Sequence, residues 1–154
     1  MKVLPEIPPD ESVRIAANMF ALPQGLIGFP TMTHAELLYM PEHLPFLWLK
    51  IRGPSGMANF VVLEPGGFIP DYELELFDGD AASLDISDSS EALVLNIVTL
   101  QPQAPLEATV NLIGPIVVNR RTRIGRQLVI ANYSRFSARH RLVLESPQAA
   151  SLSA

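Results

Sequence analysis

The sequence contains no cysteine among its 154 residues. Disulfide bonds, thiolate metal sites and a cysteine nucleophile are therefore excluded, and a disulfide-stapled secreted scaffold does not fit. The three histidines, His34, His43 and His140, are far apart and none falls in an H-x-H or H-E-x-x-H spacing, so no metal site is predicted. No cofactor is expected either, because Pro65-Gly66-Gly67 leads into an extended segment and offers no helix N-terminus to a phosphate.

Long apolar runs and an export signal are also missing. The first eleven residues combine Lys2 with three acidic residues and three prolines, which is not the basic start and apolar core of a signal peptide. The longest uncharged apolar runs, such as residues 92–100, have the length of a strand and are far short of the roughly 20 residues that a membrane helix needs. We therefore expect a cytoplasmic protein without membrane association.

Positive charge is absent from the middle of the chain. No lysine or arginine occurs from residue 53 to residue 119, whereas ten acidic residues fall there: Glu64, Asp71, Glu73, Glu75, Asp78, Asp80, Asp85, Asp88, Glu91 and Glu107. Residues 120–144 invert the pattern, with seven arginines and no acidic residue. The net charge of −5 opposes a phosphate backbone, so direct nucleic-acid binding is not expected. Three interpretations of the arginines at 120–126 stay open: a solvated loop, an RNA contact, or packing against the acidic segment.

Short apolar runs separated by proline and glycine clusters dominate the sequence, and none sustains a helical period for three turns. The eight candidate strands are residues 17–22, 46–51, 59–64, 72–76, 92–100, 108–119, 127–132 and 141–145. A chain of this size with eight short strands is typical of a barrel or bent sandwich that covers its sheet edges. We predict a mainly β, single-domain, antiparallel barrel-like fold over residues 1–146, with one or two short helical turns and a frayed tail at 147–154.

Local residue chemistry predicts several turns. The glycines of Arg52-Gly53-Pro54-Ser55-Gly56 and Gly125 in the arginine segment are expected to supply positive φ angles to two hairpins. Gly114-Pro115 predicts a bulge or bend, because proline cannot donate to a ladder. Asp78 is expected to cap one helical turn, and Ser87 or Asp88 a second.

Strict alternation in Tyr72-Glu73-Leu74-Glu75-Leu76 predicts a half-buried strand with both glutamates in water. Nothing on a solvated face raises a carboxyl pKa to the range that acid–base catalysis needs, and no G-x-S-x-G motif is present. No catalytic residue is therefore predicted, and the chain is not expected to be an enzyme. The acidic residues are interpreted as a soluble surface or a docking surface, and Trp48 as core packing or a binding anchor.

Six blocks carry a resemblance to a known family. They are LPQGLIGF at 22–29, LPFLWL at 44–49, FIPDYE at 68–73, LNIVT at 95–99, ATVNLIGPIVVN at 108–119, and Ser137 with Arg139, His140 and Leu142. In this order and spacing the blocks resemble those of the FliW family of flagellar assembly factors, over about residues 15–145.

The resemblance implies a β-barrel-like fold and a protein that binds CsrA, an RNA-binding translational regulator, and relieves its repression of flagellin synthesis. It also implies binding to flagellin, which competes for the same protein. Two alternatives stay open: a flagellin-specific chaperone without CsrA regulation, and a small-ligand-binding β-barrel. We expect a monomer whose partner-binding residues are Phe68, Pro70, Asp71, Tyr72, Glu73 and Glu75, since an acidic edge beside aromatic residues suits a binding hot spot.

Overall fold

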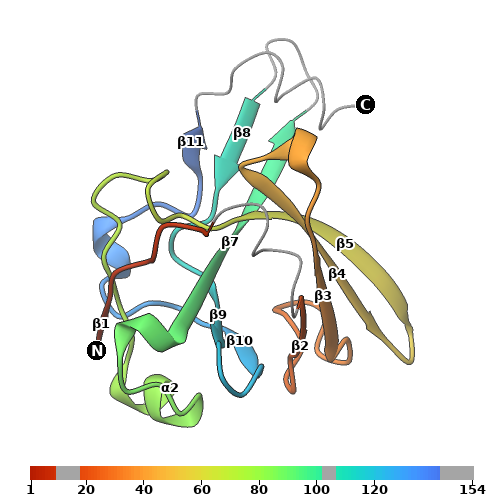
Figure 1. Cartoon of the computed structure of the whole chain (residues 1–154), viewed down its shortest axis with the longest axis horizontal. Coiled ribbons are helices and arrows are strands. Elements are labelled where there is room, and N and C mark those ends of the chain that lie inside the picture. The colour runs from red at the N-terminus through yellow and green to blue at the C-terminus, as the bar shows by residue number, and fades with distance from the viewer. Residues whose placement is uncertain (10–17, 102–106, 143–154) are drawn as a thin grey trace.

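A computed structural model of the chain describes residues 1–9, 18–101 and 107–142. The predicted tail at 147–154 lies outside these ranges, as do residue 17 of the predicted 17–22 strand and residues 143–145 of the predicted 141–145 strand. The described chain is mainly β, with short helices in the connections (Figure 1). The strands are β1 (Lys2–Val3), β2 (Met19–Ala21), β3 (His34–Leu38), β4 (Phe46–Gly53), β5 (Gly56–Leu63), β6 (Leu74–Glu75), β7 (Ala92–Gln101), β8 (Glu107–Val110), β9 (Ile116–Asn119), β10 (Gly125–Gln127) and β11 (His140–Leu142). The helices are α2 (Asp78–Ser83) and the 3-10 turns η1 (Pro41–His43), η2 (Ser89–Glu91) and η3 (Tyr133–Arg135).

Nine strands form one antiparallel sheet in the order β10-β9-β7-β5-β4-β3-β2, with β8 added to β7 and β11 added to β8. The two ends of this sheet approach each other at one point, where the Ala21 amide donates to the Arg123 carbonyl at 2.9 Å. Ala21 and Ile124 form an isolated parallel bridge there. The sheet therefore curls into a barrel-like shape without a continuous ladder between its ends, which confirms the predicted mainly β class.

The sheet separates two apolar cores. Along β7, Ala92 and Val94 belong to one core, whereas Leu93 and Leu95 belong to the other. The first core lies under β6, α2 and the segments that flank them, and the second lies inside the curl formed by β2 to β5. Because both faces are covered, β7 has a continuous buried run in place of polar alternation.

The predicted strand at 108–119 is two strands. Val98 pairs with Val110 and Leu95 pairs with Ile116, so five residues, 111–115, lie opposite only two residues of β7. Extra residues on one side of a ladder bend that side. The predicted bend at Gly114-Pro115 is confirmed, and it divides β8 from β9.

The hairpin between β4 and β5 is tighter than predicted. Gly53 pairs with Gly56 and only Pro54-Ser55 connect the strands. Gly56 has a φ of 133°, as expected, but the same expectation for Gly53 is wrong. A Cβ at Gly53 would lie 2.2 Å from the Thr31 carbonyl oxygen, so this glycine is needed for close backbone approach.

The second hairpin joins β9 to β10 and also departs from the prediction. The positive φ, 60°, is at Arg123 and not at Gly125. A Cβ on Gly125 would lie 2.8 Å from Val118 Cγ2, so Gly125 is again a packing glycine. The predicted strand at 127–132 ends early, because the Leu128 amide donates to the Pro115 carbonyl and the following residues leave the β9 ladder.

The two predicted helical turns are confirmed as α2 and η2, whereas η1 and η3 were not predicted, and one cap differs. Phe77 is the N-cap of α2, so the prediction for Asp78 is wrong; Asp78 is the first helical residue. Asp88 caps η2 and forms a capping box with Glu91, which confirms the second turn.

The strand predicted at 72–76 is reduced to β6, although its alternating burial is confirmed. No helix of residues 1–9, 18–101 and 107–142 has the length and apolarity to cross a membrane.

Asn119 joins α2 to the arginine hairpin. Its side chain is fully buried, and its Nδ2 donates to the carbonyls of Leu84 at 2.8 Å and Asp85 at 3.0 Å. Its Oδ1 accepts from the amides of Arg121 at 2.8 Å and Thr122 at 3.1 Å. One amide therefore satisfies four backbone groups that belong to two different elements.

Replacement of Asn119 by alanine is expected to lower the free energy of unfolding by about 2–4 kcal/mol, since buried backbone groups lose their partners. Urea unfolding followed by the fluorescence of Trp48, the one tryptophan, measures the change. Asn59→Ala, at an exposed position on β5, is the control and should change stability by less than about 0.5 kcal/mol. Equal effects of the two variants would contradict the assigned role of Asn119.

Candidate functional site

Five of the six predicted partner-binding residues lie in the connection between β5 and β6. A turn begins this connection, in which the Pro65 carbonyl accepts from the amides of Phe68 and Ile69, both at 2.9 Å. Ile69 is buried in the core, whereas Pro70, Asp71 and Glu73 are exposed. Asp71 has a φ of 57°, a left-handed conformation that aspartate tolerates better than most residues.

Tyr72 fastens this connection to the core. It is 3% exposed, and its hydroxyl donates to the Leu112 carbonyl at 2.7 Å. Asn96 Nδ2 donates to the same hydroxyl at 3.1 Å and to the Asn111 carbonyl at 2.9 Å. Burial raises the pKa of Tyr72 to about 12, an effect that the hydrogen bond from Asn96 partly offsets. Tyr72 therefore anchors the exposed residues of this connection to the core.

We call Asp71, Glu73 and Glu75 the acidic rim. Asn132 fixes its backbone, because Asn132 Nδ2 donates to the Glu73 carbonyl at 2.9 Å and Asn132 Oδ1 accepts from the Glu75 amide at 2.8 Å. Glu75 Oε1 lies 3.7 Å from the N-terminal ammonium group. Within the described residues, neither Asp71 nor Glu73 has a cationic side chain at ion-pair distance, so these two carboxylates face solvent.

A groove of about 760 Å³ lies beside the acidic rim. We call it the loop groove; Phe68, Pro70, Asp71, Tyr72 and Glu73 line it, together with Leu4, Ile7 and Arg135. Leu4 and Ile7 are large apolar side chains that are 65% and 76% exposed. Sequence reasoning missed these two residues and Arg135, because no local pattern shows which distant segments meet at a groove. Glu75 is the one predicted residue that does not line it.

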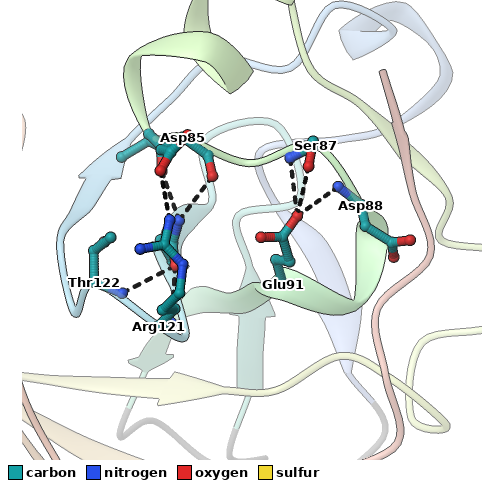
Figure 2. Close-up of polar contacts among 8 residues, drawn as sticks. Asp85, Ser87, Asp88, Glu91, Arg121 and Thr122 are labelled. Atoms are coloured by element: carbon teal, nitrogen blue, oxygen red, sulfur yellow. Dashed lines mark hydrogen bonds and ion pairs between the residues drawn. The ribbon is translucent and has the colours of Figure 1, made fainter.

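The arginine hairpin packs against the acidic segment of its own chain. Arg121 pairs with Asp85, and Arg126 Nη1 lies 3.2 Å from Asp80 Oδ1 (Figure 2 shows the Arg121 pair). These pairs confirm the intramolecular interpretation of the hairpin. The paired guanidinium groups face carboxylates, so the structure gives no support to an RNA contact through them.

The capping box of η2 lies next to this pair, and its two carboxylates accept several hydrogen bonds (Figure 2). Glu91 Oε1 accepts from the Ser87 amide at 3.1 Å, the Ser87 hydroxyl at 3.0 Å and the Asp88 amide at 2.8 Å. Asp88 Oδ1 accepts from the Ser90 amide at 2.9 Å and the Ser90 hydroxyl at 2.8 Å. These bonds to the ionised form, the backbone ones first, lower the pKa of both carboxyl groups.

Among residues 1–9, 18–101 and 107–142, no three histidine, cysteine, aspartate or glutamate side chains gather in a way that could hold a metal ion. His43 Nδ1 accepts a hydrogen bond from Trp48 Nε1 at 3.1 Å, and Trp48 packs against the first core. The core-packing interpretation of Trp48 is therefore confirmed.

The fold and this surface together define a mainly β, barrel-like domain that presents an acidic rim and an apolar groove. The model of the FliW protein family matches residues 11–142 of the chain. The chain belongs to the FliW family.

Individual relatives and a solved structure support this assignment. The flagellar assembly factor FliW of Geotalea uraniireducens is 38% identical over 120 residues, which cover 77% of this chain and 71% of the relative. The protein of the same name from Natranaerobius thermophilus is 34% identical over 125 residues, 81% of this chain and 82% of the relative. A crystal structure of the flagellar assembly factor FliW superposes with a TM-score of 0.68 at 27% identity, over 95% of this chain and 99% of that one.

The capping box predicts how stability responds to acid. Because folding lowers the pKa of Asp88 and Glu91, their stabilising contribution is complete above the ordinary carboxyl pKa of about 4 and is lost as the pH falls below it. Glu91→Gln should lower the urea midpoint at pH 7 and weaken the dependence of that midpoint on pH between about 5 and 3. The control Glu42→Gln, at an exposed position of η1, should keep the wild-type dependence. A wild-type pH profile in Glu91→Gln would refute this role of the box.

Proposed function

We propose that this chain binds the translational regulator CsrA and antagonises it, so that repression of flagellin synthesis is relieved, and that the chain also binds flagellin. Membership of the FliW family supports this proposal, and the relatives carry the name of flagellar assembly factors. The observation that carries the molecular part is the acidic rim, whose Asp71 and Glu73 are exposed beside the loop groove. A surface that combines solvent-facing carboxylates with apolar side chains suits a protein partner that is itself basic.

The charge distribution of the folded chain favours such a partner. The net charge is −5, and ion pairs within the chain hold Arg120, Arg121, Arg126 and Arg141 against carboxylates. These arginines consequently contribute little to the field that an approaching molecule meets. An RNA-binding protein carries a basic surface for phosphates, and the acidic rim is complementary to it in sign.

Antagonism follows from the same charges. Once the chain is docked beside the RNA-binding surface, Asp71, Glu73 and Glu75 repel the phosphate backbone of an approaching RNA. RNA is then excluded even where its own site is not covered. The repulsion acts over about a Debye length, roughly 8 Å at physiological ionic strength, and therefore weakens as salt is added.

Binding of flagellin completes the proposed cycle. Flagellin that accumulates occupies the chain and withdraws it from CsrA, so that CsrA represses synthesis again. Secretion of flagellin frees the chain, and the supply of flagellin is coupled to its export. A tagged chain should retain CsrA and flagellin from a bacterial lysate in which flagellin is produced; retention of flagellin alone would favour the chaperone without CsrA regulation.

Charge reversal of the rim tests the electrostatic mechanism. Glu73→Lys with Glu75→Lys should weaken the antagonism roughly tenfold, because rim charges typically alter association and its salt dependence. The measurement is a gel shift with CsrA and a flagellin leader RNA, titrated with the chain at several salt concentrations. Glu42→Lys is a matched control, since it makes one of the same changes at an exposed site away from the rim. Unchanged antagonism by the double variant would remove the acidic rim from the mechanism.

Tyr72 should be left intact in such an assay, because its burial makes any truncation a test of folding. Asp71→Asn with Glu73→Gln removes charge from the same connection without disturbing the Tyr72 hydroxyl. An intermediate loss of antagonism is expected from this pair.

A further inference from the structure

Strand β5 is paired on both sides over only part of its length within the described chain. It pairs with β4 at every residue, but with β7 only at Val61, Val62 and Leu63. Beyond this point the hairpin of β4 and β5 projects away from β7 (Figure 1). Residues 56–60 therefore form an edge of the sheet, which we call the β5 edge.

The register of the hairpin shows which backbone groups of the β5 edge face outward. Gly53 and Gly56 are joined by a two-residue turn and bond to each other. Every second residue of an antiparallel strand bonds to the same neighbour, so the N–H and C=O groups of Met57 and Asn59 point away from β4. No hydrogen bond joins these four groups to residues 1–9, 18–101 or 107–142. They are available to the backbone of another strand.

The β5 edge lacks the features that usually protect an exposed strand. Proteins blunt such edges with charged side chains or proline, and Gly56-Met57-Ala58-Asn59-Phe60 contains neither. Met57 is 58% exposed. Ala58 and Phe60, on the opposite face of the strand, pack against the second core. A strand added here would place every second side chain beside that core.

A second copy of the chain fits the β5 edge poorly. In a symmetric antiparallel pair that uses all four groups, Met57 of each copy lies opposite Asn59 of the other. The same register sets Ser55 of one copy opposite Val61 of the other, where Val98 already lies. A separate extended segment has no hairpin turn at that position, so it can bond to both residues.

We propose that the β5 edge binds an extended segment of another protein, which joins the sheet as a strand and bonds to the backbones of Met57 and Asn59. In this mode of recognition, main-chain hydrogen bonds supply affinity and alternate side chains supply specificity. The preferred segment has apolar side chains at every second position, because these cover Ala58 and Phe60. The β5 edge shares no residue with the acidic rim or the loop groove, so the proposal goes beyond the function above.

Selection of random peptides displayed on phage, panned against the full chain, supplies the probe. Asn59→Pro removes one outward N–H, whereas the matched control Asn59→Ala removes the same side chain and keeps the N–H. Enriched peptides should have alternating apolar residues and should bind Asn59→Ala as they bind the wild type. Their binding to Asn59→Pro, measured by fluorescence polarisation, should be roughly tenfold weaker. Equal binding of every enriched peptide to both variants, or no enrichment, overturns the proposal.

Methylation of one peptide amide at a time tests the pairing without a protein variant, so a folding defect in Asn59→Pro cannot obscure the result. Methyl groups on the amides that face the β5 edge should weaken binding roughly tenfold, and those on the intervening amides less than about twofold. The reason is that only every second amide of a strand bonds to one neighbour. Losses that do not alternate along the peptide overturn the proposal.

Amide hydrogen exchange of the full chain locates the bound peptide. Exchange of the Met57 and Asn59 amides should slow by about tenfold or more when the peptide is bound, because exchange then requires the added strand to open. Protection confined to the connection between β5 and β6 would place the peptide in the loop groove and overturn the proposal. Self-association of the free chain that Asn59→Pro abolishes, measured by sedimentation, would assign the β5 edge to a second copy and overturn it as well.

Discussion

Strand β7 is continuous for ten residues, whereas residues 111–115 interrupt the chain that pairs with it. Backbone groups that leave a ladder inside a folded protein need other partners, and each one left unpaired costs about 1–3 kcal/mol. Leu112 and Asn111 receive theirs from Tyr72 and Asn96. The bend at residues 111–115 is therefore coupled to the connection between β5 and β6. The Leu112 carbonyl, which the bend frees from the ladder, accepts the hydrogen bond that holds Tyr72 in place.

This coupling places the candidate surface. Because Tyr72 is held in the core, the neighbouring Pro70, Asp71 and Glu73 stay exposed at the surface. Phe136 packs edge-on against the same ring, and the adjacent residue Arg135 lines the loop groove. One buried aromatic side chain thus supports both the exposed carboxylates of the connection and Arg135, which lines the same groove.

Folding pairs some of the charged side chains of the chain with each other and leaves others unpaired. The linear sequence shows an acidic middle and a basic end, but folding neutralises only part of this contrast. Asp80 and Asp85 meet the arginine hairpin, and Asn119 locks the backbone between them. Asp71 and Glu73 of the rim, and Arg135 and Arg139, have no ion-pair partner among the described residues and are left to interact with other molecules. Charges that are already paired internally add little to recognition of another molecule, so the unpaired ones matter most there.

Much of the architecture follows from local properties of the sequence. Alternation and apolar runs predict the strands, since burial of apolar side chains has a period of two on an extended chain; Gly114-Pro115 predicts the bend, since proline removes a ladder donor. The exposed part of the rim follows in the same way from the alternation of Tyr72, Glu73 and Leu74. The predictions for Gly53, Gly125, the cap of α2 and the strand at 127–132 were wrong. The two glycines and the strand depend on neighbours distant in sequence, namely Thr31, Val118 and Pro115. The class of fold, the family and the acidic character of the middle segment could all be predicted from local patterns in the sequence. Which charges are paired and which segments line the groove could not, because residues 4, 71 and 135 come together at one groove only in the folded chain.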